Sequence, residues 1–343
     1  MKKTRIAVVG LGGMGRRWAK IASVYPKSRL KLIVDDDENK SKEVEKWQCD
    51  FASESEALTS PEIDAVVVAT PNVFLAPITK LALKNGKHVL CEKPAGINSK
   101  EVKENVELSS EAGLVYMVGF NHRFHPALAK TKQLVAEGFV GKICFIRGVY
   151  GHGGRIGYEN EWRSKLELAG GGELLDQGVH LIDLALWFLE DSFNKVFGVL
   201  TKNFWSQTLE DNAFLLLQNN SGATISLHAS WTQWQKKFLW EIYGEAGYVI
   251  VEGLGGSYGL ETLRFCKRNP ASGKPEKENK ITFYPGKGYE DPDIALFSLW
   301  HQFISSIRLN ILKSPNGYDA LRTLEIVETI YRQGGRSEKG SLS

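Results

Sequence analysis

A histidine between two acids stands out in the second half of the chain, within Gly170–Asp183. Asp176, His180 and Asp183 are spaced i, i+4 and i+7, which places them on one face of a helix. An imidazole titrates near neutral pH and can accept a proton from an alcohol, while a nearby carboxylate orients the ring. The alternative is a buried structural histidine with its own acid partner. The spacing therefore indicates general-base chemistry and leaves that alternative open.

A lysine follows an apolar run in the first half of the chain. Lys93 comes directly after Val89–Glu92, and Pro94 follows it. If the run is a strand of a parallel sheet, Lys93 lies at the edge where ligands bind. An ammonium group there polarises a hydroxyl or carbonyl oxygen. The alternative is a surface lysine paired with Glu92.

A glycine-rich turn stands near the start of the chain. Gly10, Gly12 and Gly15 match G-x-G-x-x-G between an apolar run and a helical stretch. The first glycine permits the tight turn, the second lets a pyrophosphate approach the backbone, and the third lets the helix pack closely. Because strand and helix flank the match, it predicts a dinucleotide site rather than an ordinary strand-to-helix turn.

An acidic run follows the next apolar segment. Asp35 lies 20 positions after Gly15, where a carboxylate receives the ribose hydroxyls of the dinucleotide. Asp36 and Asp37 extend the run. Because these carboxylates repel a 2′-phosphate, the run favours NAD over NADP. Lys40 and Lys42 are near enough in sequence to fold back and weaken that preference.

Strands and helices are expected to alternate over the first 120 residues and to position the lysine and the glycine turn. This alternation indicates a parallel sheet. The expected strands are Ile6–Val9, Leu30–Val34, Ala65–Ala69, His88–Cys91 and Leu114–Val118, and the expected helices are Met14–Val24, Lys40–Trp47, Ala76–Asn85 and Ser99–Ala112. We therefore predict an α/β fold with an N-terminal Rossmann domain, a doubly wound parallel sheet, over residues 1–123.

Past residue 140 the pattern changes to closely spaced strands, with Asn219–Gly222 as a hairpin turn. The expected strands are Lys142–Val149, Lys195–Thr201, Ala213–Gln218, Ala223–Ser230, Leu239–Tyr243, Tyr248–Glu252, Leu263–Lys267 and Ile281–Tyr284, and the expected helices are Pro126–Glu137, Leu174–Leu189, Ile294–Leu312 and Tyr318–Gln333. This predicts a C-terminal α+β domain with a large, mostly antiparallel open sheet over residues 124–333, for substrate binding and oligomerisation. Residues 334–343 are expected to form a frayed tail.

The predicted open sheet must hide a second apolar face. Phe214, Leu216, Ile225, Leu227 and Trp231 supply apolar side chains in alternation along the expected strands. We expect the open face to pair with another subunit, giving a homodimer or a homotetramer.

Composition excludes several classes of protein. The net charge of +3 over 343 residues, with scattered basic residues, does not indicate nucleic-acid or membrane binding. No apolar stretch reaches the length of a membrane span, and glycines interrupt the first apolar run too early for a signal peptide. The 4 cysteines lack paired spacing, so they indicate reduced thiols in the cytoplasm and no metal site.

A polar, glycine-rich segment from Gly151 to Arg163 precedes the expected catalytic helix. Arg155 and Arg163 can bind a carboxylate or phosphate, and Tyr158 can stack on the face of a sugar. The alternative is a flexible surface loop with solvated arginines.

These motifs together resemble the glucose–fructose oxidoreductase, inositol dehydrogenase and MocA family over nearly the whole chain. The markers are Gly10–Gly15, Thr70–Asn72, Gly86–Pro94, Asn121–Phe124 and Gly170–His180. The resemblance implies that Lys93, Asp176 and His180 hold the catalytic positions. The residues implied to bind the cofactor include the glycine turn and Asp35. They are Gly10, Gly12, Gly13, Met14, Gly15, Asp35, Thr70, Pro71, Asn72, Glu92, Lys93, Asn121, Trp162 and Arg163. The candidates for substrate binding are Arg123, Arg155 and Tyr158. The chain departs from many relatives at Leu75, where they carry a histidine.

The resemblance implies an NAD-dependent dehydrogenase that acts on a secondary alcohol of a sugar, cyclitol or nucleotide-linked sugar. His180 would accept the hydroxyl proton, and Lys93 would stabilise the developing alkoxide. Two alternatives stay open: cleavage of a glycoside with tightly held NAD, and a ligand-sensing regulator that has lost the chemistry. A regulator is expected to have lost Lys93 or His180, and both are present.

Overall fold

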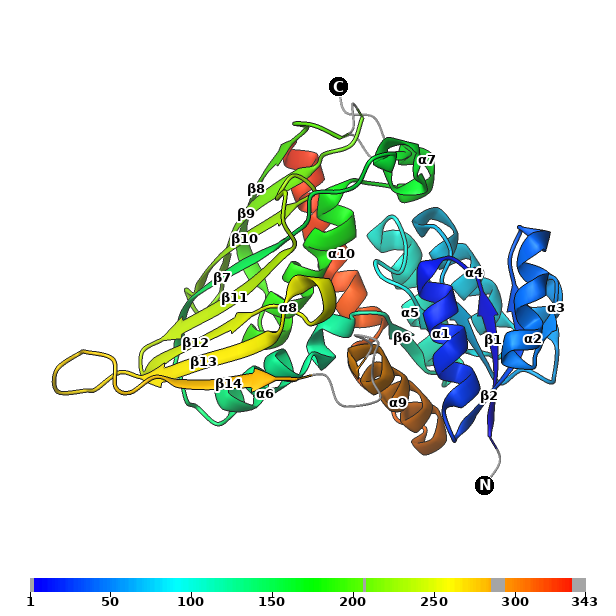
Figure 1. Cartoon of the computed structure of the whole chain (residues 1–343), viewed down its shortest axis with the longest axis horizontal. Helices are drawn as coiled ribbons and strands as arrows, with labels where there is room; N and C mark the ends of the chain where they lie inside the picture. Colours follow the sequence, from blue (N-terminus) through cyan, green and yellow to red (C-terminus); the bar gives the residue numbers. More distant parts are fainter. Residues whose placement is uncertain (1–2, 206–207, 285–293, 335–343) are drawn as a thin grey trace. The chain divides into compact units, whose positions relative to one another are not determined.

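The computed structural model describes residues 3–205, 208–284 and 294–334 (Figure 1). The chain divides into two compact units. The first holds the N-terminal part up to Phe120, together with Glu167–Ala169 and Leu296–Leu324. The second holds Asn121–Leu166, Gly170–Ala295 and the chain from Glu325 onward. The predicted tail lies outside the described residues except for Gly334.

A six-stranded sheet forms the centre of the first unit, in the order β3-β2-β1-β4-β5-β6, with every pair parallel. Its strands are β1 (Thr4–Val9), β2 (Ser28–Val34), β3 (Asp50–Phe51), β4 (Ala65–Val68), β5 (His88–Cys91) and β6 (Tyr116–Val118). The apolar side chains of β4 are fully buried, as expected for a sheet covered on both faces. The strand order reverses between β1 and β4, so the ligand crevice is expected at the carboxyl ends of these two strands. This confirms the predicted doubly wound parallel sheet.

Helices connect these strands in the expected rhythm. They are α1 (Gly13–Val24), the 3₁₀ helix η1 (Glu38–Glu43), α2 (Val44–Trp47), α3 (Glu54–Thr59), α4 (Asn72–Lys84) and α5 (Ser99–Glu111). The expected single helix over Lys40–Trp47 is instead a 3₁₀ segment followed by one α-helical turn, which ends where Gln48 adopts a left-handed φ of 53°. Strand β3 and helix α3 were not predicted, because two residues and six residues are too short to show a period.

The first unit also contains α9 (Ile294–Leu309) from Leu296 onward and the start of α10 (Gly317–Gln333). Trp300 stacks on Trp18 of α1 with ring centroids 5.9 Å apart. The hydroxyl of Tyr25 lies 2.8 Å from Nδ1 of His301. This differs from the predicted bounds, which assigned residues 124–333 to the second domain, because these aromatic contacts join segments far apart in sequence.

An eight-stranded sheet forms the second unit, in the order β14-β13-β12-β11-β7-β10-β9-β8 (Figure 1). Only β7 and β10 pair in parallel, so the sheet is mostly antiparallel, as predicted. The turn over Asn219–Gly222 joins β9 to β10. The strands are β7 (Ile143–Gly151), β8 (Phe193–Thr201), β9 (Asn212–Asn219), β10 (Thr224–Ser230), β11 (Lys237–Gly244), β12 (Gly247–Glu252), β13 (Glu261–Lys267) and β14 (Asn279–Phe283).

One face of this sheet is covered by helices, and the other has exposed apolar side chains. Helices α6 (Pro126–Ala136) and α8 (Val179–Leu189) and the end of α10 cover one face (Figure 1). Ile225, Leu227 and Trp231 are buried on it. Phe214 and Leu216 are 45% and 51% exposed. The predicted apolar set is therefore divided between the two faces, because Phe214 and Leu216 alternate with Leu215 and Leu217, which are buried opposite Leu227 and Ile225.

Short helices complete the second unit, with one exception. They are η2 (Asn121–Phe124), η3 (Tyr158–Asn160), η4 (Trp162–Ser164), α7 (Leu166–Ala169), η5 (Leu174–Gly178), which is a π-helix, and η6 (Gly256–Tyr258). The exception is Glu167–Ala169 of α7, which belong to the first unit. Among the described residues, no helix combines the length and the apolar character needed to cross a membrane. All four cysteines are free thiols.

Candidate active site

The turn between β1 and α1 requires glycine at two positions. Gly10 has a φ of +90°, and a Cβ there would lie 2.6 Å from the carbonyl oxygen of Ala69. A Cβ on Gly15 would overlap the carbonyl oxygen of Gly10. The positive φ of Gly10 fits the tight turn predicted for it, and the contact at Gly15 fits the close helix packing predicted for the third glycine.

The middle of the same turn is open. A Cβ on Gly12 or Gly13 would meet nothing within 4 Å. No acidic residue occupies the first turn of α1, and no side chain caps its N-terminus, where Met14 lies. The N–H groups at a helix start favour an anion. The turn therefore fits the pyrophosphate of a dinucleotide.

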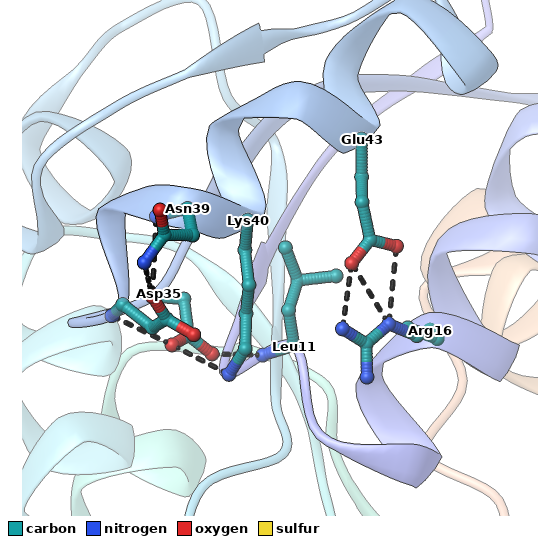
Figure 2. A network of polar contacts seen from close by, with 7 residues as sticks. Leu11, Arg16, Asp35, Asn39, Lys40 and Glu43 are labelled. Atoms are coloured by element: carbon teal, nitrogen blue, oxygen red, sulfur yellow. Dashed lines mark hydrogen bonds and ion pairs between the residues drawn. The ribbon is translucent and has the colours of Figure 1, made fainter.

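Asp35 is bound to this turn at the end of β2 (Figure 2). Its carboxylate accepts the backbone N–H of Leu11 at 2.7 Å and the ammonium of Lys40 at 2.8 Å. Burial acts to raise the pKa of Asp35, but hydrogen bonds from Lys40 and from the N–H groups of Asp37 and Leu11 outweigh it and lower the pKa. Asp35 thus stays ionised, in a position suited to ribose hydroxyls.

The nearby basic residues are engaged by acids. Lys40 folds back onto Asp35, as its position in sequence allowed. Arg16, in the first helical turns, binds Glu43 with two nitrogens at 2.6 and 2.9 Å (Figure 2). Both cations therefore have carboxylate partners within the first unit.

Residues after β4 and β5 leave the same sheet edge, since Val68 pairs with Cys91. Thr70 and Pro71 follow β4, and the hydroxyl of Thr70 is buried with no hydrogen-bond partner among the described residues. The Asn72 amide donates to the carbonyl oxygen of Ala169 at 2.9 Å. Leu75, the departure from the family pattern, is fully buried in α4.

Glu92 and Lys93 have different environments after β5. Glu92 is 8% exposed and accepts the indole N–H of Trp18 at 2.7 Å. Lys93 is half-buried, and its peptide bond to Pro94 is cis. The next residue, Ala95, has a left-handed φ of 78°. Glu92 therefore anchors the segment to α1, at the edge where Lys93 leaves the sheet.

The expected catalytic helix begins in an unexpected way. The π-helix η5 carries Asp176, and α8 follows with His180. A π turn is wider than an α turn, so the helical spacing assumed for Asp176, His180 and Asp183 does not hold throughout. Asp176 is half-buried, and its carboxylate lies 3.5 Å from Nε of Arg163.

His180 lies in a cluster of rings. It is 5% exposed and stacks on His122 of η2, with ring centroids 4.0 Å apart and an interplanar angle of 26°. Tyr150 contacts both imidazoles edge-on, with centroids 4.9 Å from His122 and 6.1 Å from His180. Asn121 Oδ1 lies 3.3 Å from Nδ1 of His122. The stack limits the orientations available to the His180 ring.

Asp183, the third residue of the predicted stripe, pairs with a buried arginine. Its carboxylate forms two hydrogen bonds with Arg123, from Nε at 2.8 Å and from Nη2 at 2.5 Å. The two side chains are 1% and 4% exposed. We therefore assign Arg123 a structural role in place of the substrate contact expected from sequence.

The segment from Gly151 to Arg163 is only partly exposed. Tyr158 is 2% exposed and packs edge-on against Trp231, so its ring cannot stack on a sugar as expected. Its hydroxyl is buried with no hydrogen-bond partner among the described residues. Arg155 is exposed and binds Glu161 at 2.6 Å. Arg163 covers the ring of Trp162 at 4.5 Å, and both are half-buried.

Sequence reasoning did not assign functions to Tyr150, Tyr258 and Gln177. The rings of Tyr150 and Tyr258 lie 5.4 Å apart, and Gln177 donates to the Tyr258 hydroxyl at 3.5 Å. Burial raises the pKa of Tyr258 to about 12, so its hydroxyl is protonated at neutral pH. These residues come from β7, η6 and η5, and no local pattern in the sequence links them. Among the described residues, no cluster of three or more metal-ligating side chains occurs.

The fold and the glycine turn are those of a dinucleotide-binding protein, and comparisons with known proteins identify a family of oxidoreductases. Residues 4–120 match the model of the oxidoreductase family with an NAD-binding Rossmann fold, and residues 128–250 match the GFO/IDH/MocA C-terminal domain. The chain is 30% identical over 273 residues to scyllo-inositol 2-dehydrogenase (NAD⁺) of Bacillus subtilis, covering 76% of this chain and 75% of that protein. The chain belongs to the Gfo/Idh/MocA family of oxidoreductases.

Two other comparisons concern a relative in sequence and a solved structure. The chain is 29% identical over 267 residues to 2,7-anhydro-N-acetylneuraminate hydratase of Escherichia coli, covering 74% of this chain and 66% of that protein. A solved structure of levoglucosan dehydrogenase with NADH superposes with a TM-score of 0.85 at 22% identity, covering 99% and 98% of the two chains. The latter likeness concerns the fold.

Proposed function

We propose that this protein is an NAD-dependent dehydrogenase acting on a secondary alcohol of a sugar, cyclitol or nucleotide-linked sugar. The observation that carries the proposal is the buried His180 ring, held by His122 and preceded by Asp176 on the π turn. An oriented imidazole with a nearby carboxylate suits proton removal from a hydroxyl. The relative named scyllo-inositol 2-dehydrogenase supports a polyol substrate.

Each residue has a separate role in this proposal. His180 accepts the hydroxyl proton, and Lys93 stabilises the negative charge that develops on the oxygen. Asp176 binds a neighbouring substrate hydroxyl and orients His180. Bound NAD supplies the hydride acceptor when the turn over Gly12 and Gly13 is occupied.

Substitution of the two proposed catalytic residues tests the roles. Lys93→Ala and His180→Ala are each expected to lower kcat by about two to four orders of magnitude. NAD affinity, measured by calorimetry, should remain close to wild type. Lys80→Ala, which removes an exposed lysine bound to Glu104, serves as the control. Rates near wild type for both variants on the true substrate would refute the assignment.

The true substrate must first be found. A screen of free sugars, cyclitols, sugar acids and nucleotide-linked sugars for NADH formation at 340 nm identifies it. Parallel assays with NADP test the proposed preference for NAD, which rests on the ionised Asp35 beside the turn. A higher kcat/KM with NADP would reverse that preference.

Cleavage of a glycoside with retained NAD is the second candidate, and the hydratase of Escherichia coli among the relatives favours it. The proposed roles of Lys93 and His180 apply to its first step as well. The two candidates differ in the fate of the cofactor. NAD that survives dialysis, with turnover and no net NADH, would support the second candidate.

We also propose that the exposed face of the second sheet joins copies of this chain in a homodimer or homotetramer. Phe197, Val199, Phe214 and Leu216 are 45–63% exposed. Phe197 pairs across strands with Leu216, and Val199 pairs with Phe214, so the four form one patch. Apolar patches of this kind commonly mark interfaces.

A cytoplasmic location is consistent with the free cysteines. Cys144 is exposed, and Cys91 and Cys266 are buried without a disulfide. Thiols persist in reducing compartments. We propose the cytoplasm on this basis.

A further inference from the structure

Three aromatic residues form an exposed cluster beside the segment from Gly151 to Arg163. We call Phe204, Trp205 and Trp234 the aromatic platform. Phe204 and Trp234 are 64% and 62% exposed. The Phe204 ring stands edge-on to both neighbours, with centroids 4.9 Å from Trp205 and 5.0 Å from Trp234. The platform therefore presents large apolar rings to solvent.

A buried carboxylate holds the part of the platform that follows β8. Asp211 is fully buried, and its side chain accepts the backbone N–H groups of Asn203, Phe204 and Trp205 at 2.6–3.1 Å. The indole N–H of Trp205 donates to the carbonyl oxygen of Trp231 at 2.9 Å. Such bonds fix the backbone, so Phe204 and Trp205 are held in place without a ligand.

Trp234 is held by contacts with the segment from Gly151 to Arg163. Its φ is 56°, in the left-handed region that non-glycine residues rarely adopt, and such strain commonly occurs at functional sites. The N–H of Gln233 donates to the carbonyl oxygen of His152 at 3.2 Å. A Cβ on Gly153 would lie 3.0 Å from Cα of Trp234, and one on Gly154 would lie 2.7 Å from the Trp205 ring. The glycine segment thus packs directly against the platform.

The segment from Gly151 to Arg163 links the platform to Asp176. The rings of Trp205 and Tyr158 lie 5.9 Å apart. The guanidinium of Arg155 lies 5.7 Å from the Tyr158 ring. Arg163, in the same segment as Tyr158, has its Nε 3.5 Å from the Asp176 carboxylate. A ligand bound at Asp176 and extending along this segment would reach the platform.

Basic residues flank the platform. Lys202 precedes Phe204, and Lys236 and Lys237 follow Trp234; all three are exposed. Arg155 is exposed, with Glu161 as its acidic partner. The pKa of His152 is lowered mainly by burial, and Lys236 and Arg155 contribute to the lowering while Asp176 opposes it. The exposed Lys202, Lys236 and Lys237 place positive charge beside the platform.

We infer that the aromatic platform and its flanking cations bind the nucleoside diphosphate part of a nucleotide-linked sugar. The base stacks on Phe204 or Trp234, and the phosphates lie toward Arg155 and Lys236. This inference rests on the proposed function and narrows its substrate class. It places the oxidised sugar near Asp176 and His180, with the nucleotide outside that pocket.

Calorimetric titration of the whole protein with UDP and with TDP tests the inference. Saturating NAD is present throughout, so that the turn over Gly12 and Gly13 is filled. Uridine and inorganic pyrophosphate, used separately, report on stacking and on charge. The test variant is Phe204→Ala with Trp234→Ala, and the control is Tyr318→Ala, which removes an exposed tyrosine from α10.

We expect at least one nucleoside diphosphate to bind wild-type protein more tightly than uridine or pyrophosphate. Loss of a stacking ring should weaken that binding by roughly 5- to 150-fold in the test variant and leave the control unchanged. No binding by either diphosphate, or equal affinity in the test variant, would overturn the inference. A change in sedimentation of the test variant would also overturn it, since the platform would then join two copies.

Failure of the proposed function gives a different result. If Lys93→Ala and His180→Ala keep wild-type rates while the test variant loses UDP or TDP affinity, the dehydrogenase assignment fails and the nucleotide subsite stands. If the two catalytic variants lose activity and no nucleoside diphosphate binds, the dehydrogenase acts on a substrate without a nucleotide.

Discussion

The buried ion pair between Arg123 and Asp183 offers a test that separates structure from substrate binding. Asp183→Asn removes a negative charge that is 1% exposed and faces a guanidinium that is 4% exposed. Breaking a buried pair by removing one partner costs about 3–5 kcal/mol of the free energy of unfolding. For a unit of this size, that cost corresponds to a Tm lower by about 6–20 °C.

Scanning calorimetry measures the effect, and the chain offers a matched control. Lys132 binds Glu190 at 2.6 Å, and Lys132 and Arg123 both lie over the Trp187 ring. Glu190 is 74% exposed in its side chain, so Glu190→Gln should cost less than about 1 kcal/mol. Arg123→Met combined with Asp183→Leu should recover most of the stability, because no buried charge is left.

The same pair connects η2, which carries His122, to α8, which carries His180. Asp183→Asn should therefore also lower kcat, by loosening the stack. The reasoning is refuted if Asp183→Asn is as stable as Glu190→Gln. It is refuted as well if Arg123→Met raises KM without loss of stability, because Arg123 would then contact substrate.

Three further outcomes follow from the structure. Gly12→Ala should fold normally and lose NAD affinity by calorimetry, whereas Gly15→Ala should be destabilised in thermal unfolding, because only the second Cβ meets backbone. Asp35 has a lowered pKa, so its contribution to stability is present above about pH 4 and is lost as the pH falls through its folded-state pKa. Asp35→Asn should therefore reduce the loss of stability at acidic pH, followed by circular dichroism. The same loss of stability in the variant and in wild type would contradict this. Leu216→Lys should shift sedimentation towards the monomer, and an unchanged mass would exclude the sheet face as the interface.

Local patterns allowed much of the first unit to be predicted. The apolar runs that became β1, β2, β4, β5 and β6 are continuous, because both faces of a parallel sheet are buried. Glycine spacing marked the turn, because Gly10 and Gly15 each lie where a side chain would strike backbone. Such constraints act within a few residues and are therefore visible in sequence.

Other features depend on partners distant in sequence. The stripe of Asp176, His180 and Asp183 was assumed to act together, but the π turn and the partner Arg123 direct Asp183 elsewhere. Tyr158 was predicted to be an exposed sugar contact but is buried, because Trp231, which follows β10, packs against its ring.

The sequence by itself determined the class of fold, the dinucleotide turn and the candidate acid, base and lysine, because periodicity and glycine spacing are local properties. Only the tertiary structure decided which side chains contact one another across long stretches of sequence: His122 stacks on His180, and α9 packs with α1. These contacts join residues separated by tens to hundreds of positions, and burial and electrostatics select them only after the chain has folded.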